Sequence, residues 1–335
     1  MMGATKSTLG LVLALMLVAC DQGAKTISAP NTSSAEMDTF VKSVKDNLVF
    51  VEGGEFLMGD YGAEYGPEKH SYDSDKDSKP IHKVRLSNFS IGRFKVTNQE
   101  YQFYLSRHGL KLRDDVAGSS YKVVSNAPNV PAYLDWYEAE KYCTWLAQTT
   151  DLPFNLATEA QWEFAARSRG QFLAVATDDG TYKATNDPVT KDWESGPSGI
   201  NISNSWDREA FAKERGWKTG TLTPLPDDRF PPNPLGLYAM SDNGLEWVKD
   251  WYDPDYYKNS PTLDPQGPDE PVFKDYFGRY VKVVRGQAFA NPRWPIGVNV
   301  QRTPAEPHGH IDKSDLVFIN SMTTRCVVNA PAPVK

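Results

Sequence analysis

The stretch Leu156–Gly170, LATEAQWEFAARSRG, carries the clearest local signal for the fold. Thr158 and Gln161 stand three residues apart, which is the spacing of a capping box at the start of a helix. The apolar residues that follow share one helical face: Trp162, Ala165 and Ala166. Gly170 predicts the end of the helix. The stretch therefore predicts a short, capped helix that packs against a core.

Two other stretches follow the same design. In TNQEYQFYLSRHG (97–109) the capping pair is Thr97 and Glu100, and in DWYEAEKYCTWLAQ (135–148) it is Asp135 and Glu138. The second stretch presents one apolar stripe at helical spacing: Ala139, Tyr142, Cys143 and Leu146. We therefore expect three capped helices and a cysteine on the buried face of one of them.

Short apolar runs predict the strands. They are LVFV (48–51), EFLMG (55–59), KVRL (83–86), YVKVV (280–284) and TRCVV (324–328). The segments between are long, and the chain has 24 glycines and 24 prolines, as expected of a fold rich in loops. We expect a single domain, because no second linker interrupts the chain, and long loops of this kind usually form functional surfaces.

Composition places the chain among globular proteins. Of its 335 residues 40% are hydrophobic and 24% are charged, and the formal net charge is −7. An acidic balance argues against nucleic-acid binding, which needs a basic surface.

The first residues predict export and lipidation. Lys6 precedes an apolar run from Leu9 to Val18, which is too short to span a bilayer, and small residues lead to Cys20. This pattern predicts a lipoprotein signal peptide over 1–19, with Cys20 lipidated. The alternative is a plain signal peptide with a chance cysteine. Residues 20–39 are then the lipidated cysteine and a flexible tether, 40–335 are the domain, and the location is the bacterial periplasm, with the inner or outer membrane holding the lipid.

Two cysteines remain, Cys143 and Cys326. In an oxidising compartment an even pair predicts a disulfide. The alternative is two separate buried thiols.

The order of motifs along the chain resembles one known family. The motifs are VEGGEFLMGD (51–60), PIHKVRLSNFSIGRFKVTNQEYQFY (80–104), PAYLDWYEAEKYCTWL (131–146), LATEAQWEFAARSRG (156–170), PNPLGLYAMSDNGLEWVKDWY (232–252), VVRGQAFANP (283–292) and TTRCVV (323–328). Together they resemble the formylglycine-generating enzyme, or sulfatase-modifying factor, family over about 49–328. The resemblance implies an α+β fold: a single compact domain with little regular secondary structure, related to C-type lectin folds. It also implies a disulfide between Cys143 and Cys326.

The resemblance implies that the family's chemistry is lost. Family enzymes oxidise a sulfatase cysteine to formylglycine with two cysteines that bind copper, and soft thiolates suit Cu(I). The corresponding turn begins at Arg285, and Gln287 and Ala288 follow it, with alanine in place of serine. Asn291 and Ile296 occupy the two cysteine positions. We expect these to be vestigial active-site positions and the chain not to be an enzyme.

The family's calcium sites are altered as well. Glu246 is kept, Gly244 still offers a carbonyl, and Asp242 is a candidate to replace the ligand lost at Ala239. The other site would begin at Asn201 and Ile202. A structural calcium is the one cofactor that the resemblance implies, and no cofactor is required.

One histidine segment offers an alternative metal site. Iron-dependent relatives use a histidine cluster from a separate helical domain, which this chain lacks. HGHID (308–312) brings two imidazoles and a carboxylate together in sequence, although a solvated turn fits its glycine and its surroundings better.

We therefore expect a non-catalytic periplasmic lipoprotein that binds a protein partner. Lipoproteins of this family without the copper cysteines resemble immunity proteins, which neutralise an antibacterial secreted effector such as a type VI phospholipase. The alternatives are a structural component of an envelope secretion machine, and a metal-dependent oxidase with divergent chemistry. The partner would be the effector or a secretion-system component, contact with the membrane would be through the lipid alone, and no nucleic acid would be involved.

Overall fold

The computed structural model describes residues 34–118, 120–184, 199–288, 298–311 and 317–334. In chain order the elements are α1 (Ser34–Asp46), β1 (Leu48–Val51), β2 (Gly54–Met58), α2 (Gly62–Tyr65), β3 (His82–Leu86), β4 (Phe89–Gly92), α3 (Asn98–Arg107), α4 (Ser120–Val124), α5 (Trp136–Thr150), β5 (Phe154–Leu156), α6 (Glu159–Ala166), α7 (Ser205–Glu214), η1 (Gly220–Leu222), η2 (Asp227–Arg229), β6 (Leu245–Trp251), α8 (Tyr256–Asn259), β7 (Lys282–Arg285), β8 (Thr303–Ala305), β9 (Met322–Thr323) and β10 (Cys326–Val328). The described residues are 28% helical and 19% strand, which confirms an α+β fold dominated by loops.

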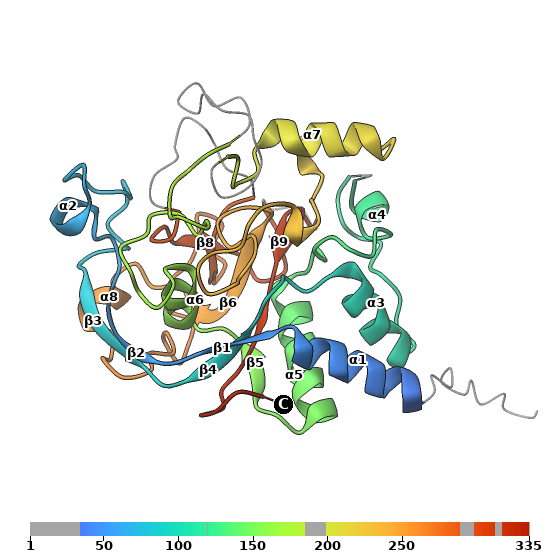
Figure 1. The fold of residues 1–335 in the computed structure, drawn as a ribbon, viewed down its shortest axis with the longest axis horizontal. Coiled ribbons are helices and arrows are strands. Elements are labelled where there is room, and N and C mark those ends of the chain that lie inside the picture. Colours follow the sequence, from blue (N-terminus) through green and yellow to red (C-terminus); the bar gives the residue numbers. More distant parts are fainter. Residues whose placement is uncertain (1–33, 119, 185–198, 289–297, 312–316, 335) are drawn as a thin grey trace, which may run out of the picture.

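Three small sheets organise the chain (Figure 1). The first has the order β1-β4-β10-β5, and all its neighbours are antiparallel. The second is the hairpin β2-β3. The third has the order β8-β7-β6-β9, in which only β6 and β9 run parallel. Every strand predicted from the sequence is present, although the predictions missed β4, β5, β6, β8 and β9.

The three predicted capping boxes are confirmed. Thr97 and Glu100 begin α3, Asp135 and Glu138 begin α5, and Thr158 and Gln161 begin α6. The predicted apolar faces are buried as well: Ala139, Tyr142, Cys143 and Leu146 on α5, and Trp162, Ala165 and Ala166 on α6. These helices start where the sequence places them because a capping box depends only on residues three positions apart.

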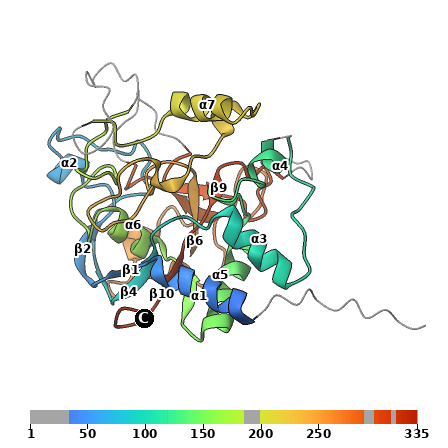
Figure 2. The ribbon, with the colours of Figure 1, turned by 45° about the vertical axis from the view of Figure 1, so that its right-hand side comes forward.

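The predicted tether was wrong at its C-terminal end. Residues 34–39, which the sequence analysis assigned to a flexible segment, belong to α1. Met37, Phe40 and Val44 recur at helical spacing in this helix and pack against the core. Both ribbon views place α1 beside α3 and α5 (Figure 2). Their pattern was hidden by the small, polar residues that precede it.

The disulfide between Cys143 and Cys326 is confirmed, with 5.7 Å between the Cα atoms. It joins the buried face of α5 to β10, the strand between β4 and β5. Within the residues that the structure describes, no helix combines the length and the apolar character needed to cross a membrane.

Candidate functional site

The turn that was predicted to be vestigial begins at the end of β7, where Arg285 is fully buried. Its Nη1 donates to Oε1 of Glu159 over 2.6 Å, and its Nη2 donates to Oε2 of Glu163 over 2.8 Å. Nη2 also donates to the carbonyl of Asn299 over 2.6 Å. Both glutamates come from α6, so the helix with the strongest sequence signal also holds the first residue of the turn.

Two more arginines complete this buried group. Arg302 donates to both carboxylate oxygens of Glu159, over 2.7 and 3.0 Å, and Arg167 donates to Glu163 over 2.7 Å. We call these five residues the Arg285 cluster: Glu159, Glu163, Arg167, Arg285 and Arg302. Burial opposes ionisation of Glu159, but the charges of Arg302 and Arg285 hold its pKa below its ordinary value. The cluster is a closed set of ion pairs, and buried charges require such compensation.

Gly286 follows Arg285 with a φ of +80°. A Cβ added to it would lie 2.7 Å from the carbonyl oxygen of Met240, so the turn needs glycine for conformation and for space. Beyond it, Gln287 donates to Gln301 over 3.1 Å, and the carbonyl of Ala288 accepts from the buried Arg208. The Gln287 side chain and the Ala288 carbonyl are both occupied by internal hydrogen bonds.

Asn291 and Ile296 lie outside the described residues, as does Cys20. The number of cysteines nevertheless limits the kind of copper site that the chain can form. The whole chain contains three cysteines, and Cys143 and Cys326 are bonded to each other. One cysteine thiol remains, so a copper site made of two free thiolates cannot be assembled within one such chain while the disulfide is intact.

The predicted calcium ligands Gly244 and Glu246 are contacted by cationic side chains of the protein. Lys95 Nζ donates to Oε1 of Glu246 over 2.8 Å and to the carbonyl of Gly244 over 3.0 Å. Arg325 donates to both oxygens of Glu246, over 2.7 and 2.9 Å. Burial opposes ionisation of Glu246, but Arg325 and Lys95 hold its pKa below its ordinary value.

The donor set around Glu246 therefore does not fit a divalent cation. A calcium ion would need several oxygen ligands that are free to face it, but the carboxylate and the carbonyl are both occupied by the Lys95 ammonium. Lys95 and Glu246 have side chains with no exposed surface, and they lie 151 residues apart in the sequence. That separation is why the local motif gave no sign of the lysine.

The remaining calcium candidates meet elsewhere. Asn201, Ile202 and Asp242 line a cavity of about 10 Å³, room for a single water molecule at most. Asp242 accepts from the backbone N–H of Ser203 over 2.8 Å, and the amide group of Asn201 donates to Asp178 over 2.9 Å. The structure thus brings these three residues together but separates them from the carboxylate of Glu246, which faces Lys95 and Arg325.

The histidine segment forms a local turn. His310 Nδ1 lies 2.9 Å from Oε2 of Glu306, and the rings of His308 and His310 are 5.8 Å apart. Asp312 lies outside the described residues. Across the part of the chain that the structure describes, no group of three or more His, Cys, Asp or Glu side chains is placed to hold a metal ion.

Comparisons with known proteins agree on one family. A family model described as "Sulfatase-modifying factor enzyme 1-like domain" matches residues 33–316. The formylglycine-generating enzyme of Streptomyces coelicolor is 28% identical over 259 residues, which cover 66% of this chain and 74% of that protein. The protein named "Chaperone protein LppX" of Paenibacillus barcinonensis is 27% identical over 244 residues, which cover 63% of this chain and 73% of that protein.

A solved structure shows the same fold. The structure of PvdO from Pseudomonas aeruginosa aligns with a TM-score of 0.56 at 22% identity, covering 84% of this chain and 93% of that one. The match of the family model to most of the chain, the fold and the retained arginine-glycine turn lead to one conclusion. The chain belongs to the family of proteins with a sulfatase-modifying factor enzyme 1-like domain.

Proposed function

We propose that this chain is a non-catalytic, lipid-anchored periplasmic protein that binds a protein partner, and that the partner is an antibacterial effector which it neutralises. Two findings favour binding over catalysis. The cysteine count leaves no thiolate pair for copper, and the first residues of the vestigial turn serve the buried Arg285 cluster.

The observation that carries the proposal is an exposed aromatic hairpin between α8 and β7, which we call the 272–280 hairpin. Its exposed apolar residues are Val272, Phe273, Tyr276, Phe277 and Tyr280. Tyr276 is 95% exposed, which is unusual for a large side chain in an ordered segment. Tyrosine, phenylalanine and arginine are the residue types enriched in protein interfaces.

The hairpin is held rigid by one aspartate. Asp275 accepts from the backbone N–H groups of Phe277 and Arg279 over 2.8 and 2.9 Å, and its other oxygen accepts from the guanidinium of Arg279 over 2.9 and 2.8 Å. Lys274 and Tyr280 pair across the base. A rigid loop loses little conformational entropy when it binds, so its aromatic side chains are suited to a protein interface.

The relatives are compatible with this proposal. One of them carries a chaperone's name, and a chaperone acts by binding another protein. The lipoprotein signal and the acidic charge of the chain fit a tethered inhibitor in the periplasm. Immunity is our choice among envelope functions because a single tethered domain with a rigid binding loop is sufficient for it.

The experiment uses the full chain, expressed with the products of neighbouring genes. We expect it to co-purify with one secreted effector and to protect cells whose periplasm contains that effector. Tyr276→Ala should weaken the complex at least tenfold, as expected for an interface anchor, whereas Trp206→Ala on α7 should not. Failure to bind any neighbouring effector, together with unchanged survival of a deletion strain under attack by sibling cells, would reject immunity.

Metal analysis tests the non-catalytic part. We expect purified full-length protein to contain far less than one copper or iron per chain. Stoichiometric copper or iron would overturn that part and support an oxidase with different ligands.

A further inference from the structure

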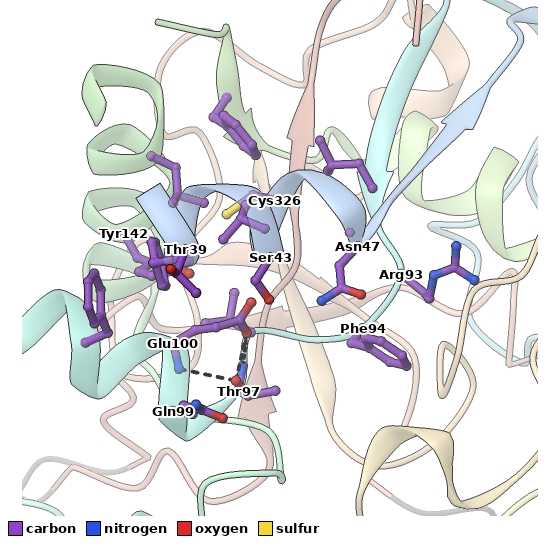
Figure 3. Close-up of a pocket in the computed structure, with 18 of the residues that line it drawn as sticks. Thr39, Ser43, Asn47, Arg93, Phe94, Thr97, Gln99, Glu100, Tyr142 and Cys326 are labelled. Atoms are coloured by element: carbon purple, nitrogen blue, oxygen red, sulfur yellow. Dashed lines mark hydrogen bonds between the residues drawn. The ribbon is translucent and has the colours of Figure 1, made fainter. Parts of the chain in front are cut away.

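A cavity of about 630 Å³ lies between α1, the segment after β4, and helices α3 and α5 (Figure 3). We call it the α1 pocket. Its apolar lining is Phe40, Val44, Leu48, Phe94, Val96, Phe103, Leu146 and Phe154. The volume is within the range of pockets that bind small molecules, and so is the mixture of a mainly apolar wall with few polar groups.

Helix α1 forms one wall of the pocket. Phe40 stacks on Phe103 with 4.3 Å between ring centroids and lies 5.3 Å from the ring of Trp145. Val44 is the buried residue of this helix. The wall is therefore fixed at these two points, while the exposed Ser43 lies at the edge of the cavity.

Glu100 is one of the charged residues that line the pocket. Its Oε2 accepts from the backbone N–H and the hydroxyl of Thr97, both over 2.8 Å, as part of the capping box of α3. Figure 3 shows the carboxyl group of Glu100 directed into the space beneath α1, on the side of Ser43. Burial raises the pKa of Glu100. Among the described residues, Thr97 donates its hydrogen bonds, its charge also acts on the buried Tyr142, and no lysine, arginine or histidine is among these partners.

The charges of the lining favour a cation. The lining contains two carboxyl groups, Glu36 and Glu100, and one basic residue, Arg93, which points away from Glu100 in Figure 3. An anionic ligand would be repelled by Glu100, and a neutral ligand would leave its charge uncompensated. An ammonium group would compensate that charge, and the surrounding aromatic rings attract cations as well.

We propose that the α1 pocket binds a small organic amine, whose ammonium group pairs with Glu100 and whose apolar body packs against the lining. The ligand must combine the two features, because the carboxyl group of Glu100 is directed into a space whose wall is mainly apolar. A simple inorganic cation would leave the apolar surface unfilled, and a hydrocarbon would leave the carboxyl unpaired.

The first experiment compares ligands that differ in one group. The full chain is titrated calorimetrically with 4-phenylbutylamine, hexylamine and tryptamine, and with the alcohol and the carboxylic acid that correspond to the first. We expect at least one amine to bind at about millimolar concentration or below and its alcohol to bind at least tenfold more weakly. Absence of binding by all three amines, or equal binding of amine and alcohol, would overturn the proposal.

The second experiment changes the site. Glu100→Gln keeps the capping box, because glutamine serves at that position, and should weaken amine binding by about tenfold to a hundredfold. Glu138→Gln makes the same change in the capping box of α5, outside the pocket, and should leave amine binding unchanged. Ser43→Trp, on the exposed side of α1, should obstruct the pocket and abolish binding. A folded Glu100→Gln variant that binds the amine as tightly as the wild type would refute the role of the carboxyl.

Discussion

Glu159 and Glu100 both belong to the first turn of a helix, but their surroundings differ. Glu159 on α6 is contacted by Arg285 and Arg302, and the space around it is filled. Glu100 on α3 accepts hydrogen bonds from Thr97, has no cationic partner among the described residues, and lines a cavity of about 630 Å³. A buried charge that is paired with other side chains of the protein stabilises the fold. A charge beside open space and without a counterion is available for a ligand.

The largest expected effect comes from removing an arginine that compensates the charge of Glu159. Arg285→Leu would remove one cationic partner from both Glu159 and Glu163, would leave each with one arginine, and should lower the free energy of unfolding by about 3–5 kcal/mol. Urea denaturation measures it. The control is Lys83→Met, which removes an exposed ion pair with Glu55 and should cost less than about 1 kcal/mol. Equal losses in the two variants would show that the Arg285 cluster is not structural.

The disulfide ties α5, a wall of the α1 pocket, to the central strand β10. Cys143→Ser and Cys326→Ser should each lower the free energy of unfolding by about 2–4 kcal/mol, because each removes the same covalent constraint. Thermal melting of both single variants measures this. Unchanged melting of both would mean that the bond does not form in the expressed protein.

Lys95→Met tests the second compensated carboxylate. Glu246 would keep Arg325 but lose the ammonium group, so we expect a loss of about 1–3 kcal/mol. The loss should be smaller than that of Arg285→Leu, since Lys95 pairs with one carboxylate and Arg285 pairs with two. A loss as large as that of Arg285→Leu would mean that Arg325 does not compensate Glu246 by itself.

Glu100→Gln tests the carboxylate that has no cationic partner among the described residues. Burial raises the pKa of Glu100, so the folded state holds a proton that the unfolded state releases above its ordinary pKa near 4.5. The contribution of Glu100 to the free energy of unfolding therefore falls as the pH rises above its ordinary pKa. The glutamine variant cannot ionise and avoids this loss. We expect wild type and variant to be similar near pH 4, and the variant to be more stable by up to about 1 kcal/mol at neutral pH. Melting curves of both proteins across pH measure this difference. A variant that lost stability relative to the wild type as the pH rose would contradict the prediction.

Calcium should have the smallest effect. Because Lys95 occupies the carboxylate and carbonyl that calcium would need, neither added calcium nor a chelator should change the melting temperature of the wild type. A shift to higher temperature with calcium would locate a cation site elsewhere in the chain.

Local patterns made part of this structure predictable. The capping boxes and the apolar face of α5 follow from spacings of three or four residues. Five strands follow from short apolar runs. The ion pairs do not, because Arg285 and Glu159 are 126 residues apart and Lys95 and Glu246 are 151 apart. Gly244 and Glu246 are likewise close in the sequence, but no neighbouring residue indicates that Lys95 contacts both. The α1 pocket depends on how four separate segments meet, so the sequence showed only its glutamate, as a helix cap.

The position of β10 has a consequence for biogenesis. This strand follows every other element of the chain, yet it lies between β4 and β5 in the first sheet. The sheet cannot close around an absent central strand, and α5 cannot form its covalent link before Cys326 is present. Most of the described residues must therefore be present before this sheet can form, so truncation just before residue 326 should be far more damaging than the loss of one three-residue strand suggests.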